Sequence, residues 1–365
     1  MKILLINPPI FNDIGRVLTN TPPLGLLYLA AFAEKNGYLD IKIVDADSAK
    51  LSWDDLKNLF LKENPDIIGI TGPSRVLPAL IKSVEIARKS LPNCKIITGG
   101  FGSTKEPERV LKAADKAVDF IVMGEGELTF LELLQQFEKS VQDFHNVNGL
   151  AFLDKQGNLT FTKPRDYIRN LSSLPWPAYH LIYPAFSEYG GVHGPYQELK
   201  HPSGVLLTSR GCPHRCTFCS LGSRMYRERE IKDVVDEIEF YKNNFGVKSI
   251  QIYDDEFIGL SPKQNERVEA MCDEIIKRGL HKSLAFWVQG RCSQFIRLET
   301  LRKMRAAGIA WVAWGVESGS QKILDSIKKD IKVENVIKDF ALTKKAGIKS
   351  LAFMMLGFPG ETPAD

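Results

Sequence analysis

Three cysteines stand close together in the middle of the chain, at Cys212, Cys216 and Cys219. The apolar run at 205–209 is typical of a short strand, and the loop after it contains a glycine and a proline. Thiolates are soft ligands that favour iron–sulfur clusters or zinc. A four-iron cluster held by three cysteines keeps one iron without a protein ligand, and that iron can bind a small molecule. The spacing therefore predicts a metal centre with an open position.

Structural zinc is the alternative to a cluster. A closed zinc site needs a fourth ligand, and His214 inside the loop is a candidate. Three buried thiols without a metal are a second alternative. No paired second C-x2-C motif is present, and residues downstream favour the cluster. The isolated Cys94, Cys272 and Cys292 are predicted to be buried thiols.

The composition is that of an ordinary globular protein. The chain has 365 residues, 44% of them hydrophobic, which is enough for about two domains. Its 48 basic residues exceed its 44 acidic ones by four and are dispersed, so we expect no nucleic-acid partner. The first apolar run, 3–6, is too short for a signal peptide, and the longest, 24–33, is too short to span a membrane. Clustered cysteines fit a reducing compartment, and we predict a cytoplasmic location.

Residues 2–139 alternate short β-rich runs with amphipathic stretches, which predicts an α/β fold with a doubly wound parallel sheet, Rossmann- or flavodoxin-like. The strands are expected at 2–6, 41–44, 67–71, 95–98 and 120–123, and the helices near 24–36, 52–62, 77–90, 106–114 and 127–139. Such sheets bind ligands at the carboxyl ends of their strands. The candidate residues in the turns at these ends are Gly72, Ser74, Gly99, Gly100, Ser103, Thr104, Gly124, Glu125, Gly126 and Glu127.

The last of these turns restricts the ligand. Glu125 and Glu127 stand at a helix start, where carboxylates suit the helix dipole but repel a phosphate. The chain also lacks a G-x-G-x-x-G motif after its first strand and a Walker lysine motif. We therefore expect a large ligand that directs little negative charge toward this edge.

Residues 141–200 are predicted to form a hairpin and a proline-rich linker. The hairpin strands are expected at 147–152 and 159–162, on either side of a polar turn. The segment 174–179 contains two prolines and is expected to be extended. The lone histidines of this region, His180, His193 and His201, are interpreted as structural.

From residue 205 the alternation of strands and helices resumes and predicts a (β/α) barrel. Strands are expected at 205–209, 248–253, 284–290, 310–316 and 348–356, and helices near 230–245, 262–279, 298–307 and 333–346. Active sites of such barrels lie at the carboxyl ends of the strands. The residues at these ends that can bind a polar ligand include Asp254, Asp255, Arg291, Glu317, Ser318 and Gly357.

In these motifs the whole chain resembles the radical S-adenosylmethionine (radical SAM) enzymes that carry an amino-terminal cobalamin-binding domain. The matching motifs are C-x3-C-x2-C at 212–219, G-V-E-S-G at 315–319, G-x-P-G-E-T at 357–362, N-P-P at 7–9, P-P-x-G at 22–25, G-G at 99–100 and G-E-G-E at 124–127. Tyr226 and Arg227 also fit the cobalamin subclass. The D-x-H-x-x-G motif, by which other cobalamin proteins supply an axial histidine, is absent.

The resemblance implies that Cys212, Cys216 and Cys219 hold a 4Fe-4S cluster whose open iron binds SAM. SAM is then cleaved by one electron to methionine and a 5'-deoxyadenosyl radical. The residues implied to place SAM are Phe218, Asp254, Asp255, Arg291, Glu317, Ser318 and Gly357. The turns of the first domain are implied to hold cobalamin without a histidine from the missing motif. A small-molecule substrate and an electron donor such as a flavodoxin or ferredoxin are implied as partners.

Two reactions remain open within this family: methyl transfer to an unactivated carbon, and oxidation or cyclisation as in the anaerobic Mg-protoporphyrin ester cyclase. A radical SAM enzyme without functional cobalamin and a non-catalytic cluster- or corrinoid-binding protein are the alternatives. We expect a cobalamin-binding-like domain at 1–140, a linker at 141–200 and a radical SAM core at 201–365. The core is expected to be incomplete, with about five barrel strands and one unpaired edge.

Overall fold

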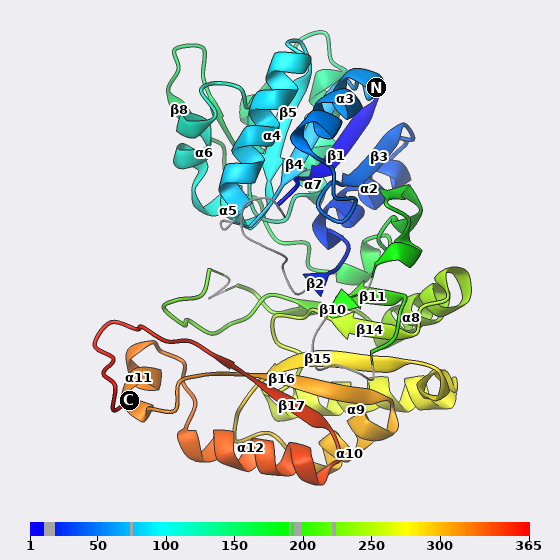
Figure 1. The fold of residues 1–365 in the computed structure, drawn as a ribbon, viewed down its shortest axis with the longest axis vertical. Coiled ribbons are helices and arrows are strands. Elements are labelled where there is room, and N and C mark those ends of the chain that lie inside the picture. The colour runs from blue at the N-terminus through cyan, green and yellow to red at the C-terminus, as the bar shows by residue number, and fades with distance from the viewer. Residues whose placement is uncertain (11–18, 74–75, 190, 193–198, 221–223) are drawn as a thin grey trace. The chain divides into compact units, whose positions relative to one another are not determined.

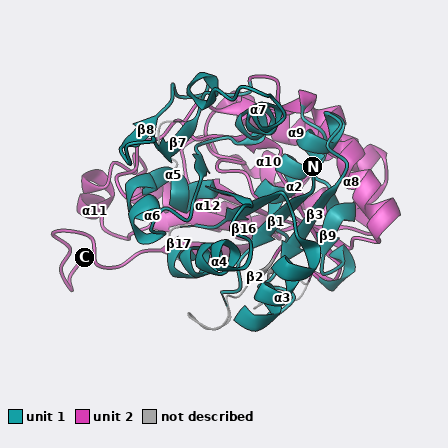
Figure 2. Ribbon diagram, turned by 90° about the horizontal axis from the view of Figure 1, so that it is seen from above, with its two compact units in different colours: residues 1–18, 22–168, 174–188 teal, residues 19–21, 169–173, 189–365 magenta. Residues whose placement is uncertain are grey.

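The computed structural model describes residues 1–10, 19–73, 76–189, 191–192, 199–220 and 224–365, so Ser74 and His193 lie outside the described residues. The chain forms two compact units, coloured separately in Figure 2. Unit 1 comprises residues 1–18, 22–168 and 174–188, and unit 2 comprises residues 19–21, 169–173 and 189–365. No helix in the described part of the chain is long and apolar enough to cross a bilayer.

Unit 1 is built on one eight-stranded sheet, in the order β8-β7-β6-β5-β4-β1-β3-β9 (Figure 1). Its parallel strands are β1 (Ile3–Asn7), β3 (Ile41–Asp45), β4 (Ile67–Thr71), β5 (Lys95–Gly99), β6 (Phe120–Val122) and β9 (Ile182–Tyr183). The predicted hairpin forms β7 (Leu150–Leu153) and β8 (Leu159–Phe161), which extend the sheet antiparallel at β6. Because β1 lies between β3 and β4, the chain winds outward in both directions, which confirms a parallel α/β arrangement.

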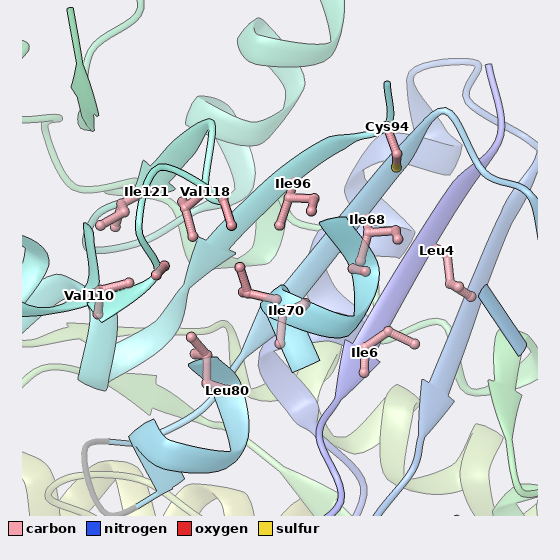
Figure 3. Close-up of a cluster of buried hydrophobic side chains, with 14 of the residues drawn as sticks. Leu4, Ile6, Ile68, Ile70, Leu80, Cys94, Ile96, Val110, Val118 and Ile121 are labelled. Carbon is pink, nitrogen blue, oxygen red and sulfur yellow. The ribbon is translucent and has the colours of Figure 1, made fainter. Parts of the chain in front are cut away.

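Helices cover both faces of this sheet. They are α2 (Leu24–Lys35), α3 (Trp53–Glu63), α4 (Leu77–Ser90), α5 (Gly100–Lys105), α6 (Pro107–Ala113) and α7 (Glu127–Phe137). One face packs against α3, α4 and α6 through a buried cluster that includes Leu4, Ile6, Ile68, Ile70 and Leu80 (Figure 3). Helices α2 and α7 contact each other, contribute nothing to this cluster and cover the opposite face (Figure 2). Both faces being buried explains the continuous apolar strands.

Unit 2 contains a five-stranded sheet whose spatial order follows the chain. Its strands are β11 (Ser203–Leu206), β14 (Ser249–Ile252), β15 (Ala285–Arg291), β16 (Ile309–Glu317) and β17 (Lys349–Met354), all parallel. Its helices are α8 (Ile231–Phe245), α9 (Pro262–Lys277), α10 (Leu298–Ala306), α11 (Gln321–Ser326) and α12 (Val333–Lys345). Because every strand runs in the same direction, all five carboxyl ends meet at one edge, where the predicted site residues stand.

Short elements complete the two units. Two-stranded ladders join β2 (Thr19–Asn20) to β10 (Gly191–Val192) and β12 (Ser209–Arg210) to β13 (Arg227–Glu228). Single 3-10 turns are η2 (Phe144–Asn146), η3 (Leu171–Ser173), η4 (Tyr179–Leu181), η5 (Phe186–Glu188) and η6 (Leu280–Lys282). The ladder between β12 and β13 closes the segment that contains the three cysteines.

A buried arginine anchors this ladder to α8. Arg229, which follows β13, donates to the carbonyl of Leu207 at 2.9 Å and to Asp233 at 2.9 and 2.8 Å. It also pairs with Glu237, which is fully buried and accepts a hydrogen bond from Tyr241. Burial raises the pKa of Glu237, and the guanidinium opposes that rise. The network therefore depends on Arg229 as the cation that compensates a carboxylate with no access to water.

We expect Arg229→Met to lower the free energy of unfolding by about 3–5 kcal/mol, because it leaves the Glu237 carboxylate buried without its cation. Urea unfolding followed by tryptophan fluorescence measures this loss. Arg278→Met is the control, since Arg278 bonds Asp236, Glu239 and Glu274 where these side chains reach the surface. The control is expected to lose about 1 kcal/mol or less. Equal losses in the two variants would contradict the special role of Arg229.

Candidate active site

The cysteine loop leaves β12 through a glycine that tolerates no side chain. Gly211 has a φ of +90°, and a Cβ there would lie 2.2 Å from the carbonyl oxygen of Met225. Beyond it, the carbonyl of Cys212 accepts a hydrogen bond from the amide of Arg224 at 2.9 Å. The amide of Thr217 donates to the carbonyl of Ile327 at 3.0 Å. These backbone contacts fix both halves of the loop to other parts of unit 2.

Asp254 holds the chain where it enters the loop. Its carboxylate is fully buried and accepts hydrogen bonds from the amides of Thr208 and Ser209 at 2.6 and 3.1 Å. The hydroxyls of the same two residues also donate to it, that of Ser209 at 2.7 Å. Burial raises the pKa of Asp254, and these donors oppose the rise. Asp254 therefore positions the strand end and lacks the exposed oxygen that the predicted contact with an ammonium group needs.

The next two acidic residues contact the next positions of the loop. Asp255 accepts a hydrogen bond from the amide of Gly211 at 3.0 Å. The thiol of Cys212 lies 3.8 Å from Oε2 of Glu256. Three successive acidic residues after β14 thus contact the chain, in order, from the start of the cysteine loop to its first cysteine. The sequence predicted an acidic run at this strand end but not that two of its members bind the protein backbone.

Three buried polar atoms at the cysteine loop have no hydrogen-bond partner among the described residues. They are Nε2 of His214, in the loop itself, and Nη2 of Arg291 and Oε1 of Glu256, whose residues are 5% and 3% exposed. Arg291 also places Nη1 4.0 Å from the sulfur of Cys216. Native structures seldom leave such atoms unpaired, and a bound ligand is one explanation. A guanidinium and a carboxylate together suit a ligand that carries both a carboxylate and an ammonium group, as the methionine part of SAM does.

The fourth strand ends in an unusual backbone conformation. Glu317 has a φ of +68°, and the register between β16 and β17 shifts between Gly315 and Glu317. Its Oε1 accepts a hydrogen bond from Nζ of Lys329 at 2.8 Å, and both side chains are nearly buried. Ser318, the next residue, accepts a hydrogen bond from the amide of Ser320 at 3.1 Å. Non-glycine residues at positive φ are rare and concentrate at functional sites.

Phe218 links the cysteine loop to the fourth and fifth strand ends. Lys329 places its ammonium 5.9 Å from the centre of the Phe218 ring. The ring of Phe358 lies 5.8 Å from that of Phe218, centre to centre. Gly357, with a φ of +88°, and Phe358 both donate their amides to the carboxylate of Glu361. The structure thus brings the predicted Phe218, Glu317 and Gly357 into one region.

Sequence reasoning missed Lys329. It lies in the connection between α11 and α12, away from every strand end, and its neighbour is also a lysine. The run from Ile327 to Ile331 has three charged residues between two isoleucines and resembles any exposed turn. No local signal distinguishes Lys329 from Lys328, so only the packing of the unit identifies it.

The three thiols do not form a finished metal site in this structure. No three cysteine, histidine, aspartate or glutamate side chains converge to hold a metal ion in the part of the chain that is described. Burial raises the pKa of Cys212 to about 12 and lowers that of His214 to about 4. Ligation by the three cysteines, and by His214 in the zinc alternative, stays a prediction.

In unit 1 the three predicted turns meet at one edge of the sheet. The amide of Gly102 donates to the carbonyl of Gly72 at 3.1 Å, which joins the turns after β4 and β5. The amide of Gly124 donates to Oγ1 of Thr104 at 3.1 Å, which adds the turn after β6. Gly100 has a φ of +82°, and a Cβ there would lie 2.5 Å from Oγ1 of Thr71. These contacts join the turns that contain the candidate residues of this edge, apart from Ser74.

Two observations in these turns fit a ligand. Ser103 is fully buried, and its hydroxyl has no hydrogen-bond partner among the residues described. Gly124 has a φ of +75°, and a Cβ there would meet nothing within 4 Å, so its surroundings are open. Gly126 differs, because its Cβ would lie 3.0 Å from Leu29 on α2. Glu125 and Glu127 flank it at the start of α7, where their charge suits the helix dipole.

Comparison with known proteins identifies relatives over the whole chain. The model of the radical SAM superfamily matches residues 206–365, and that of the B12 binding domain matches residues 13–134. The uncharacterized methyltransferase PH0819 of Pyrococcus horikoshii is 31% identical over 99% of this chain and 75% of its own length. The anaerobic magnesium-protoporphyrin IX monomethyl ester cyclase of Rubrivivax gelatinosus is 29% identical over 99% of this chain and 63% of its own. These matches confirm the resemblance predicted from the motifs.

Solved structures show the same fold. The cobalamin-dependent radical enzyme OxsB, with aqua-cobalamin and S-adenosylmethionine bound, matches 97% of this chain with a TM-score of 0.79 and 20% identity. The methyltransferase TsrM from Kitasatospora setae matches 99% with a TM-score of 0.77 and 20% identity. The chain spans 49% of the length of OxsB and 69% of that of TsrM. At this identity the likeness establishes the arrangement of the elements.

We expect Gly211→Ala to displace the cysteine loop, because the added Cβ collides with a backbone carbonyl. Gly246→Ala is the matched control, since Gly246 has a φ of +63° and a Cβ there meets nothing within 4 Å. Both variants lose about 1 kcal/mol of stability from the left-handed backbone. Only Gly211→Ala should also lose iron uptake after anaerobic reconstitution, measured as iron bound per chain. Equal iron contents would show that the loop does not depend on this close approach.

Proposed function

Because the chain belongs to the radical SAM superfamily and carries a B12-binding domain, we propose that it acts as a cobalamin-dependent radical SAM enzyme. The observation that supports this most strongly is the pair of unpartnered buried atoms on Arg291 and Glu256 beside the cysteine loop. The two atoms supply one donor and one acceptor, which suit a zwitterionic ligand such as the methionine part of SAM. The chain covers only part of each relative, so the activity of a complete protein is part of this proposal.

We assign the cluster to Cys212, Cys216 and Cys219. The chemistry that a bound 4Fe-4S cluster supplies is one-electron cleavage of SAM to methionine and a 5'-deoxyadenosyl radical. Arg291 places Nη1 4.0 Å from the sulfur of Cys216. Glu256 lies on the other side, near Cys212.

The remaining side chains of unit 2 place SAM. Arg291 donates to its carboxylate, and Glu256 replaces Asp254 as the acceptor for its ammonium, since Asp254 is already saturated. Asp255 holds the loop through Gly211. We assign Glu317, with Ser318, to the ribose hydroxyls. Phe218 and the Gly357 turn form the surface for the adenine.

We assign the cobalamin site to unit 1, at the joined turns that contain Gly72, Gly99 to Thr104 and Gly124 to Glu127. Bound cobalamin supplies a methyl carrier for transfer to an unactivated carbon, or serves a related oxidation or cyclisation. Relatives whose names record methyl transfer and ring formation support both reactions. The sequence lacks the D-x-H-x-x-G motif, so we propose binding without a histidine from it.

The other assignments follow from the same proposal. Residues 1–140 serve cobalamin, 141–200 form the hairpin and linker segment, whose strands β7, β8 and β9 belong to the sheet of unit 1, and 201–365 form the radical SAM core, whose five parallel strands are part of a (β/α) barrel. The substrate is a small molecule, and the electron comes from a donor such as a flavodoxin or ferredoxin. None of the six cysteines, all of which lie in the described part, forms a disulfide, which supports a reducing, cytoplasmic setting.

Cys216→Ala is expected to abolish SAM cleavage, because a cluster held by two cysteines is not retained. The assay is 5'-deoxyadenosine formed from SAM and dithionite after anaerobic reconstitution with iron and sulfide. Unit 1 should stay folded, as judged by hydroxocobalamin binding. Cys272→Ala, which removes a buried thiol on α9 far from the loop in sequence, should retain cleavage. Cleavage by the Cys216 variant, or zinc in place of iron in anaerobically purified protein, would refute the cluster assignment.

Gly124→Asn is expected to weaken hydroxocobalamin binding about tenfold or more. Asparagine accepts the left-handed backbone better than most residues, so the change mainly fills open space at the proposed site. Gly157→Asn is the matched control, because Gly157 has a φ of +85°, lies between β7 and β8, and a Cβ there also meets nothing within 4 Å. An absorbance titration measures both. Unchanged affinity in the Gly124 variant contradicts the site, and a wild-type protein that binds no hydroxocobalamin favours an enzyme without functional cobalamin.

A further inference from the structure

Lys329 is a buried lysine in unit 2 that no motif marks. Lys329 is only 7% exposed, although lysine is among the residues least often buried. The ammonium lies 2.8 Å from Oε1 of Glu317 and 5.9 Å from the centre of the Phe218 ring. It therefore stands between the end of β16 and the cysteine loop, beside two residues assigned above to SAM.

The backbone around Lys329 is held in a rare conformation. Lys328 and Asp330, its two neighbours, each have a φ of +53°, in the region that side chains seldom adopt. The amide of Lys329 donates to the carbonyl of Leu324 at 3.0 Å. Its partner Glu317 is also at positive φ. Such conformations persist only where the surrounding structure imposes them, and here they determine the direction of one ion pair.

Gly315, two residues before Glu317 on β16, leaves room for this ion pair. A Cβ at Gly315 would lie 2.9 Å from Nζ of Lys329 and 3.2 Å from Oε1 of Glu317. Gly315 is not at positive φ, so the need for glycine there is a need for space. A larger residue would separate the ammonium from the carboxylate. Three features of the chain, Gly315 and the two strained segments, thus converge on the Lys329–Glu317 contact.

Stability is a weak reason for this arrangement. Removing two charges from water costs about as much as their attraction returns, so a buried ion pair contributes little net stability. The pair does have an effect on the site. With Lys329 on Oε1, Glu317 carries no uncompensated charge and keeps Oε2 as an acceptor. Such a group accepts hydrogen bonds from neutral hydroxyls and has little attraction for the ammonium or sulfonium of SAM.

We propose that Lys329 is a positioning residue, which holds Oε1 of Glu317 so that Oε2 accepts hydrogen bonds from the ribose hydroxyls of SAM. The role rests on the proposed function, because it assumes that SAM binds in unit 2. This role adds to the proposed SAM site a residue that does not lie at a strand end. It also predicts which part of SAM depends on that residue. Loss of Lys329 should affect recognition of the ribose and leave the methionine part, which we assign to Arg291 and Glu256, unaffected.

The test compares two ligands on the full chain after cluster reconstitution. The ligands are SAM and an analogue of SAM whose ribose lacks both hydroxyls, and anaerobic equilibrium dialysis without reductant gives their dissociation constants. We expect Lys329→Met to weaken SAM binding about tenfold, the scale of one charge-assisted hydrogen bond. The analogue should bind the variant and the wild type equally. Glu317→Gln should show the same selective loss, and Lys329→Arg should recover part of the affinity.

Lys303→Met is the matched control, because Lys303 also lies 2.8 Å from a carboxylate, that of Asp273, but on the surface. It should bind both ligands as the wild type does. Equal weakening of SAM and analogue in Lys329→Met would overturn the positioning role, since a merely structural lysine affects both. If Lys329→Met does not fold, Lys329→Arg decides by the same comparison of ligands. A reconstituted wild type that binds neither ligand would instead refute the proposed function and, with it, this role.

Discussion

The carboxylate of Asp254 fixes where the cysteine loop begins. A buried carboxylate must be satisfied by donors, and here all of them come from Thr208 and Ser209, the last residues before the loop. The strand that supplies Asp254 lies beside β11, so the contact locks the start of the loop to the neighbouring strand end. Asp255 then bonds Gly211, and Glu256 approaches Cys212. The position of the first cysteine thus follows from one strand end without any metal.

The four charged side chains of the site differ in how completely their hydrogen bonds are satisfied within the protein. Lys329 and Glu317 are bonded to each other, whereas Arg291 and Glu256 each keep a buried atom without a partner. Unsatisfied buried groups cost about 1–3 kcal/mol each, so a protein retains them where a ligand supplies the missing partner. Lys329 and Glu317 therefore suit neutral hydroxyls. Arg291 and Glu256 suit the carboxylate and the ammonium of a zwitterion. Under the proposed function, this difference orients a ligand with a zwitterionic end and a ribose in a single direction.

Much of this arrangement could be predicted from the sequence. Periodicity located the parallel strands of both units except β9, and the residues after those strands had to meet at one edge, which placed Arg291, Glu317 and Gly357. The sequence could not tell which member of the run Asp254 to Glu256 faces the cysteines, because consecutive carboxylates look alike until the packing is known. It also missed Lys329, whose role depends on strained neighbours and on Gly315, which precedes it by 14 residues on β16. Contacts between distant segments have no local signal.

The glycines of unit 1 are a second case in which the sequence could not separate candidates and the structure can. Every glycine in the turns after β4, β5 and β6 was an equal candidate for approach to a ligand. Gly100 instead lets the turn after β5 pack on Thr71, and Gly126 lets α7 pack on α2 through Leu29. Gly124 alone among these three combines a left-handed backbone with open surroundings. A glycine can allow a close contact within the protein, or it can leave open space beside the backbone. Only a glycine that leaves open space is evidence for a ligand. The open face of this edge therefore centres on the turn after β6.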